Sequence, residues 1–91
     1  MKYSVLWTAY AETNLVRLWV DSTNRNALSE SVAKIDRELG NGPLSIGESR
    51  DPGERILFEL PLAVKYRVAE SDRKVLVFAI WLVPRQDHHS Q

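Results

Sequence analysis

The chain has 91 residues, of which 12 are Lys or Arg and 12 are Asp or Glu, so its formal net charge is zero, and it contains no cysteine. This length suffices for one small domain with a single hydrophobic core. Zero net charge argues against nucleic-acid binding through bulk electrostatics, although a local basic patch could still provide it, and the lack of cysteine excludes disulfide bonds, thiol nucleophiles and zinc–thiolate sites.

The first part of the chain predicts a strand followed by a helix. Residues 2–7 (KYSVLW) have the composition of a short strand. Thr8 stands where a helix N-cap is expected, and Glu12 falls in the first turn, where the helix dipole favours an acid. Apolar residues then recur at helical spacing, at Ala11, Leu15, Leu18 and Trp19. We therefore expect a helix over residues 9–21.

A second helix is expected at about residues 25–39. The preceding residues 21–24 (DSTN) are typical of turns and helix caps. Apolar residues return with the same helical period, at Leu28, Val32, Ile35 and Leu39. Gly40 is placed for a left-handed cap beyond the last turn. Two such helices joined by a short link predict an αα-hairpin whose apolar faces pack on a sheet.

The remainder of the chain predicts a long loop and then three strands. Residues 44–54 have no usable period and are rich in loop formers, and loops of this length in small domains are often functional. Residues 55–84 contain three apolar runs, separated by a bend at Pro61 and by a polar hairpin loop over residues 70–73. The third run is apolar at nearly every position, as expected of a central strand.

The order of elements predicts a two-layer α+β fold, in which an N-terminal strand and an αα-hairpin pack with a mostly antiparallel sheet that ends in a three-stranded meander. The whole chain, residues 1–91, is expected to form one domain with a polar tail over residues 86–91. We expect no signal peptide, because Met1 and Lys2 are followed directly by a strand-like run. We expect no membrane span, because the longest apolar run, residues 75–84, is far too short to cross a bilayer. The expected location is the cytoplasm.

Alternation along the meander predicts two faces of different character. If the even-numbered residues face the core, the opposite face carries cations and a large aromatic side chain. Its expected members are Arg55, Leu57, Glu59, Ala63, Lys65, Arg67, Val75, Val77, Ala79 and Trp81. We expect a functional surface there.

At this point the sequence resembles the RelE/ParE toxin superfamily of type II toxin–antitoxin, or plasmid stabilisation, systems. The resemblance covers residues 2–85 and rests on three stretches: WTAYA at residues 7–11, GERIL at residues 53–57, and YRV at residues 66–68 followed by VLVFAI at residues 75–80. None of these is a sharp motif, and the order of elements carries much of the resemblance. It implies the RelE/ParE fold described above.

The resemblance implies two alternative activities. RelE-like members are ribosome-dependent endonucleases that cut mRNA without a metal, using basic residues and often a C-terminal tyrosine or histidine, whereas ParE-like members bind and poison DNA gyrase. The nuclease pattern is patchy in this chain: Arg85 matches an important arginine of the nucleases, but Ala63 and Pro84 stand where basic residues are usual. His88 and His89 follow in place of a tyrosine.

A metal-free ribonuclease needs several converging cations and an acid–base group. If the chain is a nuclease, Lys65, Arg67 and Arg85 are the candidate catalytic residues, and the wider target-binding face adds Arg55 and Trp81. Each also has a plain structural explanation, because exposed charges on a half-buried sheet are ordinary. His88 and His89 are better explained as polar tail residues without a specific role than as a general base or a pair of metal ligands.

The resemblance also implies a cognate antitoxin that wraps the toxin. The aromatic and aliphatic residues of the first strand and helix exceed the needs of one small core, and an exposed apolar patch usually marks a partner site. The candidate antitoxin-binding residues are Trp7, Tyr10, Trp19 and Val20.

The patchy basic set and the zero net charge favour the ParE-like mode, inhibition of DNA gyrase by binding. A RelE-like mRNA endonuclease acting on the ribosome, or an inactive relative that only binds antitoxin, is the alternative. We expect no cofactor and no metal. A homodimer and a toxin–antitoxin hetero-oligomer are both compatible with the sequence.

Overall fold

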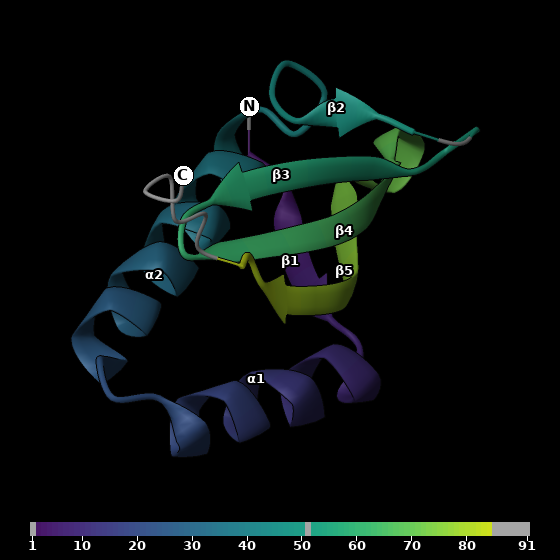
Figure 1. Cartoon of the computed structure of the whole chain (residues 1–91). Coiled ribbons are helices and arrows are strands. Elements are labelled where there is room, and N and C mark those ends of the chain that lie inside the picture. Colours follow the sequence, from purple (N-terminus) through teal and green to yellow (C-terminus); the bar gives the residue numbers. More distant parts are fainter. Residues whose placement is uncertain (1, 51, 85–91) are drawn as a thin grey trace.

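The computed structural model describes residues 2–50 and 52–84 (Figure 1). Its elements follow the predicted order of strand, helix, helix, long loop and meander. They are β1 (Ser4–Trp7), α1 (Ala9–Asp21), α2 (Arg25–Asn41), β2 (Glu48–Ser49), β3 (Arg55–Glu59), β4 (Leu62–Ala69), the 3₁₀ helix η1 (Glu70–Asp72) and β5 (Lys74–Leu82). The predicted loop over residues 44–54 differs in one detail, because it contains the two-residue strand β2.

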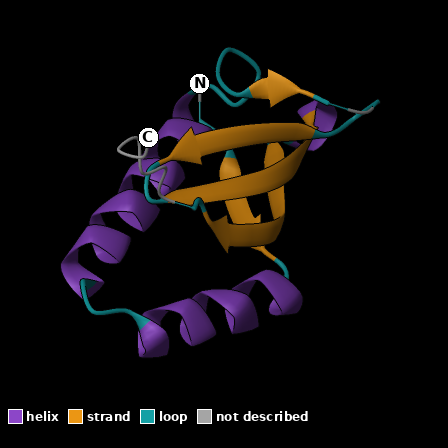
Figure 2. Ribbon diagram, in the orientation of Figure 1, coloured by secondary structure: helices purple, strands orange, loops and turns teal. Residues whose placement is uncertain are grey.

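The strands form one five-stranded sheet in the order β1-β5-β4-β3-β2. The β2–β3, β3–β4 and β4–β5 pairs are antiparallel, whereas β1 pairs with β5 in parallel. A parallel pair requires a long crossover, and here all the intervening elements provide it. The sheet and helices make the expected α+β fold of two layers (Figure 2).

Side-chain caps define where the helices begin. The Thr8 hydroxyl accepts a hydrogen bond from the Ala11 amide at 3.1 Å, and the Asn24 side chain accepts from the Ala27 amide at 3.1 Å. The predicted end of the second helix is wrong by a few residues. Gly40 lies inside α2, and the helix ends at Asn41 with Gly42 as its extended C-cap.

No helix in the part of the chain that the structure describes is long and apolar enough to cross a membrane.

The hydrophobic core lies between α1, α2 and one face of the sheet. The helices contribute Ala11, Leu28, Ile35 and Leu39, and the strands contribute Leu57, Leu62, Val64, Tyr66, Val75, Val77 and Ile80. α1 packs on β5, whereas α2 packs on β1, β3 and β4. The two helices therefore rest on different strands and splay apart, as Figure 1 shows.

The expectation that all even-numbered residues of the meander face the core is right for β4 and for the end of β5, where Ile80 is buried, but it is wrong for β3 and for the start of β5, where Val75 and Val77 lie in the core. On β3, Leu57 is buried and pairs with the core residue Val64, so the odd-numbered residues of that strand face the core. On β5, a bulge changes the alternation, because Lys65 pairs with Ala79 whereas the adjacent Tyr66 pairs with Val77. An extra residue in one strand reverses the facing of every residue beyond it.

Candidate functional site

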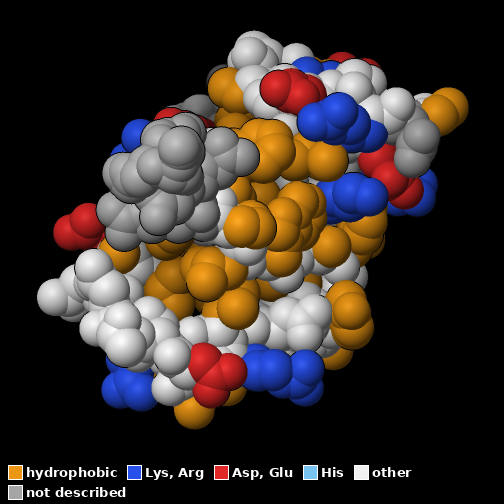
Figure 3. All heavy atoms as spheres, viewed as in Figure 1, with side chains coloured by type: hydrophobic (Ala, Val, Ile, Leu, Met, Phe, Trp, Pro, Cys, Tyr) orange, Lys and Arg blue, Asp and Glu red, His pale blue; other side chains and the backbone are white. Residues whose placement is uncertain are grey.

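The face of the sheet away from the helices, here called the outer face, is mainly apolar. Phe58, Ala63 and Trp81 form one row across β3, β4 and β5, and Ile56, Lys65 and Ala79 form the next. Leu6 of β1 pairs with Leu76 of β5 beyond them. The exposed fractions of Leu6, Phe58 and Leu76 are 47%, 44% and 39%. Figure 3 shows hydrophobic side chains gathered across the middle of the view, with Lys and Arg side chains at the upper right and along the lower edge.

Lys65 and Arg67 bring positive charge to the outer face, as the sequence predicts. The guanidinium of Arg67 donates to Oε2 of Glu54 at 2.7 Å and lies 5.4 Å from the centre of the Phe78 ring. The Glu54 side chain is only 16% exposed, so this carboxylate is held in place against the arginine. Lys65 has no ion pair within residues 2–50 and 52–84. The net positive charge of the face is therefore small.

Arg55, the remaining described cation of the predicted face, lies on the opposite side of the sheet. It pairs in register with Tyr66, and its guanidinium donates to the Ile46 carbonyl at 3.0 and 3.2 Å and to the Gly47 carbonyl at 3.3 Å. The Tyr66 hydroxyl lies 2.8 Å from the Pro43 carbonyl oxygen and 2.9 Å from that of Ile46. Burial raises the pKa of this hydroxyl, partly offset by Arg55. Arg55 thus anchors the loop before β2 and does not join Lys65 and Arg67.

Three residues named from the sequence lie outside the described part of the chain, namely Arg85, His88 and His89. Within the described part, the outer face brings together Lys65, Arg67 and Trp81. Phe78 joins them through its contact with Arg67. Nothing in the pattern of the sequence indicates Phe78, because the side of the sheet on which its ring lies depends on the bulge that precedes Ala79.

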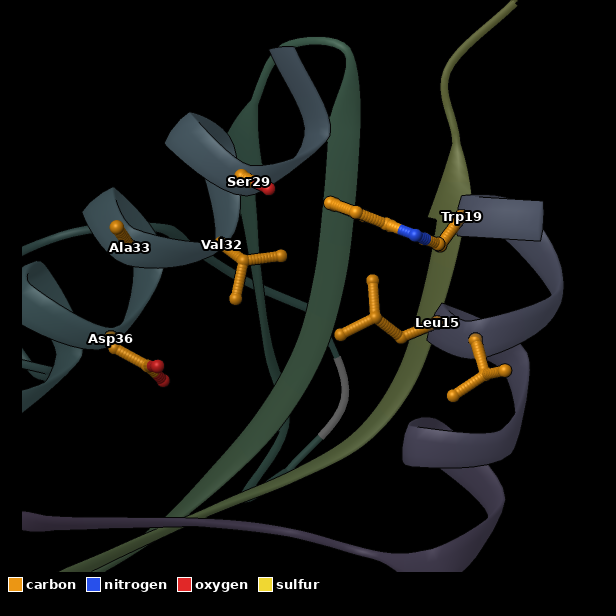
Figure 4. Close-up of a pocket in the computed structure, with 7 residues that line it drawn as sticks. Leu15, Trp19, Ser29, Val32, Ala33 and Asp36 are labelled. Atoms are coloured by element: carbon orange, nitrogen blue, oxygen red, sulfur yellow. The ribbon is translucent and has the colours of Figure 1, made fainter. Parts of the chain in front are cut away.

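The second notable surface is a groove between the two splayed helices. It has a volume of about 500 Å³ and is lined by Leu15, Val16 and Trp19 of α1 and by Ser29, Val32, Ala33 and Asp36 of α2. Leu15, Trp19 and Val32 point toward one another across it (Figure 4). The groove is apolar except at Ser29 and at Asp36.

Hydrogen bonds fix both ends of the groove. Near the link between the helices, Arg25 donates to the Trp19 carbonyl at 3.0 Å and to the Val20 carbonyl at 3.2 Å, and its guanidinium lies 6.0 Å from the centre of the Trp19 ring. At the other end, the indole N–H of Trp7 donates to Oδ1 of Asp36 at 3.0 Å. The groove is therefore held open by contacts from β1, α1 and α2.

Two of the four predicted antitoxin-binding residues lie at this groove, and two do not line it. Trp19 lines it, and Trp7 holds Asp36 in it. Tyr10 and Val20 are exposed, with fractions of 69% and 61%, and are not among its lining residues. The α2 wall was missed because Val32 belongs to the same sequence stripe as the buried Leu28 and Ile35, so the pattern alone assigns it to the core.

The carboxylates of the described residues do not assemble into a metal site. No group of three or more Asp and Glu side chains within residues 2–50 and 52–84 could hold a metal ion. The pKa of the Glu38 carboxyl is raised, first by its hydrogen bond with Glu59 and then by burial. Lys34 forms a salt bridge with Glu59 at 3.4 Å. The Lys34–Glu59 salt bridge connects α2 to the end of β3 and lies apart from the outer face.

Comparison with solved structures identifies the fold. The chain is similar to one in the RelBE2 toxin–antitoxin complex of Mycobacterium tuberculosis, with a TM-score of 0.74, 20% identity, and coverage of 90% of this chain and 99% of the other. It is similar to one in the chromosomal ParDE system of P. aeruginosa (TM-score 0.63, 20% identity, coverage 91% and 98%). It is also similar to the isolated E. coli RelE toxin (TM-score 0.63, 18% identity, coverage 97% and 92%).

No protein-family model and no curated protein sequence matches the chain. The structural similarity extends over nearly the whole of each chain, so this protein has the fold of RelE and ParE toxins. The fold predicted from the sequence is confirmed.

Proposed function

We propose that the chain is the toxin of a type II toxin–antitoxin module and that it inhibits DNA gyrase by binding. In this proposal the outer face of the sheet binds gyrase, and the groove between α1 and α2 binds the cognate antitoxin. The observation that carries the choice of a protein target is the apolar character of the outer face. Exposed aromatic and aliphatic side chains grouped on one surface are typical of protein-binding sites.

The charges on the outer face support a protein target over a nucleic acid. The charge of Arg67 is offset by Glu54 at 2.7 Å, which leaves Lys65 as the unpaired cation among the described residues of β4. A nucleic acid is bound mainly through several cations that neutralise phosphates. A protein surface needs only shape complementarity, an apolar centre and a few charges at the rim, and the outer face provides these.

Ribosome-dependent cleavage of mRNA is the second candidate, and one observation favours it. Lys65 and Arg67 lie on the same face, and Arg67 lies over the ring of Phe78, so a phosphate and a stacked base could be bound together. The required acid–base group would have to come from His88 or His89, which lie outside the described residues. The described outer face contributes charge and an aromatic ring.

An antitoxin partner is supported by the groove and by the similar structures. Two of those structures come from toxin–antitoxin systems, one described as the complex of both components. The groove presents an apolar surface of the kind that accepts an amphipathic helix. Trp19 in its wall is 38% exposed and lies beside the exposed Val16, so the groove presents a contiguous apolar surface that a partner could cover.

The test combines growth, RNA integrity and gyrase activity. The chain is expressed from an inducible promoter, growth is followed, mRNA 5′ ends are mapped by primer extension, and the purified chain is added to a gyrase supercoiling assay. We expect growth arrest, intact mRNA and inhibited supercoiling. New mRNA ends at codon boundaries would support the nuclease instead, and normal growth would leave a protein that only binds antitoxin.

Two outer-face variants separate the mechanisms more sharply. Leu76→Glu places a charge in the exposed apolar surface and should abolish growth arrest if that surface binds a protein. The double variant Lys65→Gln and Arg67→Gln keeps the apolar surface and should retain most activity. A nuclease would show the opposite ranking, because each lost cation of a catalytic site costs about 3 kcal/mol, or roughly a hundredfold in rate.

A further inference from the structure

We propose that Asp36 selects a positively charged side chain on the helix that occupies the groove. The groove then recognises an amphipathic helix that carries one Lys or Arg at the end of its apolar stripe. This inference rests on the proposed antitoxin site and specifies the chemistry by which the partner is recognised.

Among the described residues, Asp36 is the one acidic residue that lines the groove. Its Oδ1 atom accepts the Trp7 indole N–H at 3.0 Å, which fixes the carboxylate and leaves Oδ2 available. The ion pairs within residues 2–50 and 52–84 are Lys34–Glu59, Arg50–Glu48 and Arg67–Glu54, so no cation in that part of the chain is paired with Asp36. The groove therefore contains a negative charge that is held by a neutral hydrogen bond and has no cationic partner among the described residues.

The position of Asp36 makes the two ends of the groove different. Leu15 and Val32 face each other in the groove, Trp19 lies nearer the link between the helices, and Asp36 lies farther along α2 (Figure 4). An occupant that covers the apolar middle partly excludes water from the carboxylate, and a cation at that end would form a charge-assisted hydrogen bond with it. An acidic side chain there would be repelled. The match of one charge at one end favours a single orientation of the occupant.

The groove suits a helix better than an extended strand. Its walls are the side chains of two helices, and its lining residues include none from β1 or β2, the edge strands of the sheet. An extended peptide would place unpaired backbone N–H and C=O groups against these apolar side chains, whereas a helix pairs its own. The volume of about 500 Å³ accommodates the apolar side chains that a helix projects at i, i+3 or i+4, and i+7.

The experiment uses the full chain as bait for a display library of amphipathic peptides of about 18 residues, long enough to form measurable helix. The peptides carry Leu at the helical stripe positions and random residues at both ends of the stripe. Selection is run in parallel on the unmodified chain, on Asp36→Asn and on Asp36→Lys. Asp36→Asn keeps an oxygen that can accept the Trp7 N–H and removes only the charge.

We expect the unmodified chain to enrich Lys or Arg at one end of the stripe, Asp36→Asn to lose this preference, and Asp36→Lys to enrich Asp or Glu. The best peptide for the unmodified chain should bind Asp36→Asn about tenfold more weakly or worse, since hydrogen bonds to charged groups exceed neutral ones. Val16→Glu, in the groove wall, should weaken every selected peptide. Arg17→Glu, the next residue on the same helix but outside the lining, is its matched control.

An unchanged charge preference on Asp36→Asn, or no selected peptide sensitive to Val16→Glu, would overturn the proposal. These outcomes do not depend on toxicity, so the two proposals can fail separately. A chain that does not arrest growth but shows the Asp36-dependent preference would refute the toxin assignment and support the groove selectivity. A chain that arrests growth through gyrase without that preference would do the reverse.

Discussion

Arg55 and Arg67 lie on neighbouring strands and have different environments because their side chains leave the sheet on opposite sides. Arg55 faces the helices and donates to the carbonyl groups of Ile46 and Gly47, so its charge serves the loop before β2. Arg67 faces outward, over Phe78 and against Glu54. The facing of a single residue thus distinguishes a cation that holds structure from one that can meet a partner.

The loop that Arg55 anchors depends on a glycine, and Gly47→Ala tests this. Gly47 has a φ of +75°, and a Cβ atom there would lie 2.7 Å from the Tyr66 hydroxyl oxygen and 2.9 Å from the Ile56 carbonyl oxygen. Because neither the backbone conformation nor the space suits alanine, the free energy of unfolding should fall by about 1–3 kcal/mol. The measurement is urea unfolding followed by tryptophan fluorescence.

Gly40→Ala is the matched control. Gly40 lies within α2, where an added Cβ atom would lie 3.6 Å from the Tyr3 carbonyl oxygen, an ordinary contact. Alanine is preferred to glycine in a helix by roughly 0.5–1 kcal/mol, so stability should be unchanged or higher. Equal losses for both variants would contradict the assignment of strain to position 47.

At the scale of elements, the sequence predicts which segments form helices and strands better than it predicts which way they face. The caps at Thr8 and Asn24 and the helical stripes are local signals, so the helices could be placed from short windows of sequence. The facing of the meander could not be, because it depends on the pairing of separate strands. The reversed facing of β3 and the bulge between β4 and β5 leave no clear mark in the alternation of apolar residues.

The candidate sites show the same limit. Lys65, Arg67 and Trp81 lie on one face, as expected, because each belongs to a strand segment whose even-numbered residues face the core, whereas Arg55 lies on the other face. The groove was only partly identified, because it exists through the splay of α1 and α2, which rest on different strands. A stripe of apolar residues on a helix does not indicate whether a neighbouring helix covers all of it.

Arg25 of α2 is hydrogen-bonded to the end of α1, and Arg25→Ala should loosen that end. The guanidinium satisfies two carbonyl groups of the last turn of α1 and adds a positive charge where the helix dipole favours one. Its removal should destabilise that turn by about 1 kcal/mol, which corresponds to roughly fivefold faster hydrogen exchange of the amides there. Amide exchange followed by NMR measures this directly.

Arg17→Ala provides the comparison, because Arg17 lies on the same helix and is exposed. It should leave exchange in the last turn of α1 unchanged, and neither variant should alter exchange in the central strand β5. If Arg25→Ala left the last turn as protected as before, Arg25 would not be the residue that holds α1 in place.

Across the whole molecule, the two candidate surfaces lie on opposite sides of one sheet. The groove belongs to the helical layer, and the outer face is the side that the helices leave free (Figures 1 and 2). The core between them is formed by the buried residues of both layers. Since a packed core transmits small changes but leaves distant surface residues independent, each surface should be alterable without loss of the other.

Two single substitutions test this independence. Leu76→Glu on the outer face and Val16→Glu in the groove both alter exposed side chains, with exposed fractions of 39% and 61%, so both variants should fold with nearly normal melting temperatures. Leu76→Glu should abolish growth arrest and bind the groove-selected peptides normally. Val16→Glu should arrest growth normally and bind those peptides at least tenfold more weakly, a change of about 1.4 kcal/mol. If each folded variant lost both properties, the target and the antitoxin would share one surface, and the assignment of separate roles to the two sides of the sheet would be wrong.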